Sequence, residues 1–120
     1  MTPKLSSDER IAQFPFDSAY QLYLNKLERK GHTEEELQTV LKWLTGYTKA
    51  QLKKHVEKRT SLEDFFAKAK LNPNASLIKG LICGYRVEDI ENPLTQKARY
   101  MDKLVDEVAR GKKMESILRS

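Results

Sequence analysis

Helix-start signals recur along this chain, and apolar residues follow each of them at helical spacing. Thr33 and Glu36 form a capping box, in which each side chain satisfies a backbone N–H of the other. Thr48 and Gln51 repeat the same pattern further along the chain. The dipeptide Asn92-Pro93 is a third start, because proline at the first helical position loses no intrahelical hydrogen bond. Starts of this kind, each followed by apolar positions three and four residues apart, predict amphipathic helices.

The periodic segments add up to an all-α fold. We predict about seven helices and give strands less weight. The predicted helices cover residues 18–30, 33–45, 48–59, 61–69, 75–83, 93–110 and 114–118. Residues 17–120 are expected to form one compact helical bundle, a size that fits a single domain. Residues 1–16 lack periodicity and contain Pro3 and Pro15, so they are predicted to be an irregular N-terminal arm.

The least charged part of the chain is residues 72–84, which carry one charge although 32% of all residues are charged. Four apolar residues of this segment share one helical face: Leu77, Ile78, Leu81 and Ile82. A helix over 75–83 is too short to be stable alone, so it is predicted to be buried at the centre of the bundle. A strand within 77–87 is the alternative. Two glycines and the missing two-residue period count against that strand.

Composition limits the class of protein. The chain has 120 residues, a formal net charge of +5 and a single cysteine. One cysteine excludes an internal disulfide framework and a CxxC zinc site. No apolar run approaches the roughly 20 residues that cross a bilayer, and the first residues lack the apolar segment of a secretory signal. We therefore expect a cytoplasmic protein without membrane contact.

No common catalytic or nucleotide-binding motif occurs in the sequence. Cys83 would need a base or a positive environment to react, and both histidines, His32 and His55, lie far from it in the sequence. We interpret Cys83 as a small buried side chain. No catalytic residue, metal ligand or cofactor is predicted. The weaker alternative is an enzyme with a pocket formed by Cys83, Tyr85 and Arg86.

The helix predicted at 48–59 is unusually basic. Its cationic residues are Lys49, Lys53, Lys54, Lys58 and Arg59. The preceding helix, Gly46 and this helix have the length of a helix-turn-helix, in which a basic helix contacts DNA. Lys42 occupies the position where that motif has a small residue, which counts against it. Nucleic-acid binding by these five residues is therefore an alternative function and not the favoured one.

Four stretches of the sequence carry a resemblance to a known family. They are WLTGY at 43–47, NPNASLI at 72–78, ICGYRVE at 82–88 with NPL at 92–94, and YMDKLVDE at 100–107. Over about residues 14–119 the chain resembles the uncharacterised bacterial family DUF2200. The resemblance implies a small bacterial, cytoplasmic protein. It implies no activity and transfers no functional residues.

The function predicted from these features is a non-enzymatic helical interaction module. Well-capped amphipathic helices without a catalytic constellation favour it. Its partner is expected to be another protein or a second copy of the chain.

Overall fold

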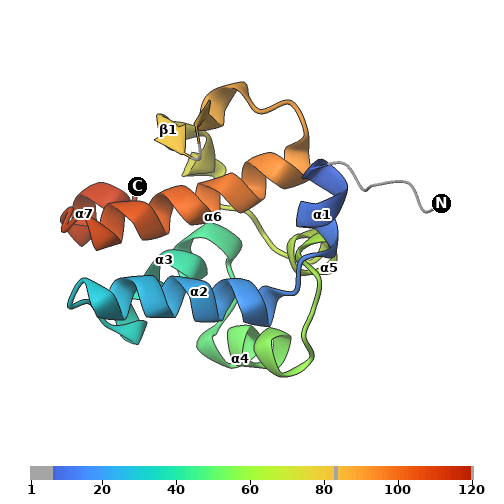
Figure 1. Cartoon of the computed structure of the whole chain (residues 1–120), viewed down its shortest axis with the longest axis horizontal. Helices are drawn as coiled ribbons and strands as arrows, with labels where there is room; N and C mark the ends of the chain where they lie inside the picture. Colours follow the sequence, from blue (N-terminus) through green and yellow to red (C-terminus); the bar gives the residue numbers. More distant parts are fainter. Residues whose placement is uncertain (1–6, 83, 120) are drawn as a thin grey trace.

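The computed structural model describes residues 7–82 and 84–119, and most of them are helical (Figure 1). Seven α-helices lie within these ranges: α1 (Ser7–Gln13), α2 (Phe16–Arg29), α3 (Glu34–Thr45), α4 (Lys49–Glu57), α5 (Leu62–Ala67), α6 (Pro93–Ala109) and α7 (Met114–Ile117). Two short 3-10 helices, η1 (Pro73–Leu77) and η2 (Val87–Asp89), flank a hairpin of β1 (Leu81–Ile82) and β2 (Tyr85–Arg86). The predicted all-α fold is confirmed.

Helix α6 is the centre of the bundle. It packs against α1, α2, α3, α5 and α7, and in Figure 1 it runs alongside α2 with α7 folding back at its end. Asn92 caps it, accepting from the Thr95 backbone N–H at 3.0 Å, as its Asn-Pro start predicts. Its long apolar stripe explains the central position, since Met101 and Leu104 are fully buried.

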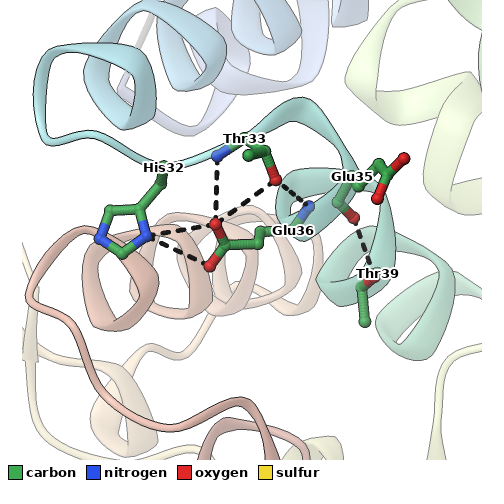
Figure 2. A network of polar contacts seen from close by, with 5 residues as sticks. All are labelled: His32, Thr33, Glu35, Glu36 and Thr39. Atoms are coloured by element: carbon green, nitrogen blue, oxygen red, sulfur yellow. Dashed lines mark hydrogen bonds and ion pairs between the residues drawn. The ribbon is translucent and has the colours of Figure 1, made fainter.

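Both predicted capping boxes are present. The Thr33 hydroxyl accepts from the Glu36 N–H at 3.3 Å, and the Glu36 carboxylate accepts from the Thr33 N–H at 3.1 Å (Figure 2). His32 extends this box, because its Nδ1 lies 3.2 Å from the same carboxylate. Thr48 and Gln51 make the equivalent pair of bonds at the start of α4. Local side-chain chemistry therefore determines where α3 and α4 begin.

Residues 7–13, which we predicted to be irregular, form helix α1 instead. This helix packs against α5 and α6, with Ile11 against the core. Tertiary contacts stabilise it, and seven residues are too few to show an apolar period in the sequence. Residues 1–6 of the predicted arm lie outside the described residues.

The prediction of a buried central helix over 75–83 is wrong. The chain forms the five-residue η1 and then the antiparallel hairpin, in which Leu81 pairs with Arg86 and Ile82 with Tyr85. Gly80 has a φ of +113°, a conformation that a right-handed helix cannot contain. Leu77 and Leu81 are 53% and 62% exposed. The strand alternative is the one found, and α6 takes the central place instead.

Candidate functional site

The β1–β2 hairpin is held against the outer side of α6, opposite α2 in Figure 1. Lys103 of α6 donates to the Leu81 carbonyl at 3.1 Å. Gln96 of the same helix donates to the Val87 carbonyl at 3.1 Å. The base of the hairpin is closed by the Val87 N–H, which donates to the Gly80 carbonyl at 2.9 Å. These bonds anchor the backbone of the hairpin, while the side chains of Leu81 and Tyr85 remain exposed.

Three large apolar side chains of this region remain in water, and we call them together the hairpin surface: Leu77, Leu81 and Tyr85. These are three of the five large apolar side chains that are exposed among the described residues. Tyr85 is 66% exposed, more than any of the others. Leu81 pairs with Arg86 and Tyr85 pairs with Ile82, so Leu81 and Tyr85 point to opposite faces of the hairpin and offer apolar contact area on both.

Charges of both signs border the hairpin surface. Lys79, Arg86, Glu88 and Asp89 are all exposed. The Glu88 carboxylate accepts from the Gly80 N–H at 3.0 Å. This hydrogen bond is the main cause that holds the pKa of Glu88 below its ordinary value, and the charges of Arg86 and Lys79 lower it further. The surface therefore joins apolar contact area to a balanced set of charges.

Two residues of the predicted pocket, Tyr85 and Arg86, line a cavity of about 650 Å³ between the hairpin, α1 and α6. Arg99 and Asp8 line it from the other elements, and the Asp8 carboxylate accepts from the Thr95 hydroxyl at 2.6 Å. Cys83, the third predicted residue, lies outside the described residues. That this cavity binds or transforms a ligand stays a prediction.

The five cationic residues predicted to bind nucleic acid are all exposed on or just after α4, and no one cavity is lined by all of them. Lys49 and Lys53 line a cavity of about 420 Å³ together with the acidic residues Glu34 and Glu35. Lys58 and Arg59 line a separate cavity at the other end of the helix. Lys54 lines neither of them. Nucleic-acid binding by the whole helix stays a prediction.

The second of these cavities, which we call the basic cavity, measures about 510 Å³ and lies between the end of α4 and α5. Its lining residues are His55, Lys58, Arg59, Thr60, Ser61, Asp64 and Lys68. Lys68 comes from the end of α5, so no local pattern in the sequence indicates that it joins Lys58. Two helices thus place cations around one hollow.

His55 lines the basic cavity and is held there by contacts with its neighbours, although its position on a basic helix suggests a solvated side chain. Its Nδ1 lies 3.0 Å from the Thr60 hydroxyl. Its ring packs 4.7 Å from that of Tyr47 and edge-on to Phe65 at 5.2 Å, measured between ring centroids. Burial lowers the pKa of His55, and the positive charges of Lys68 and Lys58 lower it further. Both effects favour the neutral form of the imidazole.

Neither a metal centre nor a membrane span is found in the described part of the chain. Over residues 7–82 and 84–119, no group of three or more His, Cys, Asp or Glu side chains is placed to hold a metal ion. Within the same residues, every helix is too short or too polar to span a bilayer.

The comparisons with known proteins agree with the resemblance in the sequence. A family described as an uncharacterized protein conserved in bacteria, DUF2200, matches residues 10–119. The chain belongs to the DUF2200 family. Among solved structures, it is similar to the crystal structure of the uncharacterized protein SP1917, with a TM-score of 0.87 and 35% sequence identity over 97% of this chain and 94% of the other. The comparison with curated proteins gave no match.

Proposed function

We propose that this DUF2200 protein is an interaction module that self-associates through its hairpin surface. The observation that carries the proposal is the exposure of Leu77 and Leu81 in the least charged segment of the chain and of Tyr85 directly after it. Apolar area left in water favours association when it is covered by a partner. The hydrogen bonds from α6 hold the backbone at Leu81 and Val87 in place, so binding would order little additional backbone there.

A second copy of the chain is the partner that fits the bordering charges. An isologous dimer places the same patch on both sides of a two-fold axis, so each charge must find its opposite within the patch. Lys79 and Arg86 supply positive charge beside the negative Glu88 and Asp89. The outer edge of β2 is unpaired within the described sheet, whereas on the edge of β1 the Leu81 carbonyl accepts from Lys103. An unpaired edge can pair with the equivalent edge of another copy.

The size of the patch limits the strength of this association. A stable interface buries roughly 800 Å² on each partner, which is more than three side chains provide. We therefore expect a weak dimer whose population rises with protein concentration.

Sedimentation velocity over a wide concentration range tests this proposal. The wild-type chain should shift from monomer to dimer, and Leu81→Lys should keep it monomeric. Leu22→Lys on α2 is the matched control, because Leu22 is 59% exposed and lies away from the hairpin. A wild-type protein that stays monomeric at the highest concentration would overturn the proposal, and so would equal loss of dimer in both variants.

A further inference from the structure

We propose that the basic cavity between α4 and α5 binds a phosphate group. Lys58 and Arg59 approach it from the end of α4, and Lys68 approaches it from the end of α5. Thr60 and Ser61 also line it. The Ser61 hydroxyl accepts from the Asp64 N–H and can still donate. Cations and hydroxyl donors around one hollow are the groups that recognise phosphate oxygens.

The charges in the cavity are not balanced by the protein. Within the described residues, neither Lys58 nor Lys68 has a carboxylate at ion-pair distance. Asp64 is the acidic residue that lines the cavity. Arg59 pairs with Asp17 at 3.3 Å through its Nε, but its side chain remains 70% exposed, which leaves the guanidinium end accessible. A dianion would therefore find more positive than negative charge here.

The backbone of Arg59 is a second and independent indication. Its φ is +52°, in the left-handed region that costs a residue with a Cβ about 1–2 kcal/mol. The chain places glycine in this conformation after other helices, as at Gly31, Gly46 and Gly111. At the end of α4 it places an arginine whose side chain lines the basic cavity. Strain of this kind is typical of positions where the side chain has a role that glycine cannot fill.

The volume of the cavity leaves room for more than a free phosphate ion. At about 510 Å³ it is larger than an inorganic phosphate requires and falls within the range of small-molecule sites. The phosphate group could belong to a small phosphate monoester or to the backbone of a nucleic acid. Both sources share the chemistry that the cavity recognises, and a titration with each of them separates the two.

The two histidines allow a direct test by NMR. His55 lines the cavity, whereas His32 lies in the capping box of α3 and serves as an internal control. At constant pH and ionic strength, chloride is exchanged for inorganic phosphate while the imidazole carbon-bound protons are followed. We expect the His55 signals to move with saturation and the His32 signals to stay. The titration is repeated with ribose 5-phosphate and with a short single-stranded DNA.

Saturation with inorganic phosphate or ribose 5-phosphate indicates a small phosphate ligand, and saturation with DNA alone indicates a nucleic-acid backbone. In either case Lys58→Ala with Lys68→Ala should weaken binding at least about tenfold, since each charge-assisted hydrogen bond contributes strongly. The matched control is Lys49→Ala with Lys53→Ala, which removes the same charge from α4 outside the cavity. Equal weakening in both double variants, or His55 signals that no probe moves, would overturn the proposal.

Arg59→Gly adds a readout that a structural role would not give. Glycine relieves the left-handed backbone but loses the ion pair with Asp17, and because the two effects oppose each other the unfolding temperature should change little. Phosphate affinity should nevertheless fall about tenfold. Unchanged affinity would show that Arg59 does not hold the ligand.

Discussion

The chain contains two Asn-Pro starts with nearly the same local chemistry and very different outcomes. Asn92-Pro93 opens the 17-residue α6, and Asn72-Pro73 opens the five-residue η1. Both asparagines cap through the side-chain oxygen, Asn92 accepting from Thr95 and Asn72 from Asn74. A start signal therefore does not determine the length or the type of the helix that it opens.

The difference lies in the residues after the start. Behind Asn92 the apolar stripe continues for more than four turns, and α6 buries it on several sides. Behind Asn72, Ala75 and Ile78 reach the core, but the backbone turns away at Gly80. Low charge in this segment therefore does not mean that the whole segment is buried, since Leu77 and Leu81 are exposed. Sustained periodicity predicts a core helix, whereas apolar composition alone does not.

The largest expected effect is on the free energy of unfolding, when a leucine of α6 and a leucine of the hairpin are each replaced by alanine. Leu104→Ala in α6 should lower the free energy of unfolding by about 2–5 kcal/mol, because its side chain is fully buried and leaves a cavity. Leu81→Ala in the hairpin should lower it by less than about 0.5 kcal/mol, because that side chain is mostly in water. Urea unfolding of dilute protein measures both values. Similar losses in the two variants would mean that the hairpin belongs to the core.

A smaller effect on stability is expected for Gly80→Ala. Its sign differs between the helix predicted over 75–83 and the hairpin that is found. In a helix over 75–83, Gly80→Ala would stabilise the protein by about 1 kcal/mol. In the hairpin the positive φ makes alanine unfavourable, and we expect a loss of about 1–2 kcal/mol. An added Cβ would meet only the flexible end of Lys103 at 3.4 Å, so the backbone conformation dominates the loss. Thermal unfolding monitored by circular dichroism gives the sign of the stability change. A variant more stable than the wild type would support the helix over 75–83 and contradict the hairpin.

The parts of the fold that depend on neighbouring residues could be predicted from the sequence. The capping boxes at Thr33 and Thr48 and the Asn92 cap depend on partners three residues away, and all are present. Helix α1 and the hairpin depend on packing against α6, which no local pattern encodes. The basic cavity could be predicted only in part for the same reason. Lys58 is recognisable from its basic helix, but Lys68 lies near it only because the fold brings the ends of α4 and α5 together.

The smallest expected effect concerns the hydrogen bond between Glu88 and Gly80 in the hairpin. This contact is polar and exposed, whereas the contacts that hold α6 are apolar and buried. The Glu88 carboxylate accepts from the Gly80 N–H, and this bond holds the pKa of Glu88 below its ordinary value. The folded hairpin therefore binds fewer protons than the unfolded one. The contribution of this contact is complete above the ordinary glutamate pKa and is lost as the pH falls through the lowered value.

Glu88→Gln should remove this pH dependence, because an amide does not titrate. In the wild type the Gly80 amide proton signal should shift as the pH is lowered from neutral, with a midpoint below that of an unperturbed glutamate. In Glu88→Gln that titration should vanish, while Glu91→Gln, which changes a nearby exposed acid, should keep it. Because Glu88 is fully exposed, global stability should hardly change. A Gly80 signal that titrates alike in both variants would show that the Gly80 N–H senses a group other than Glu88.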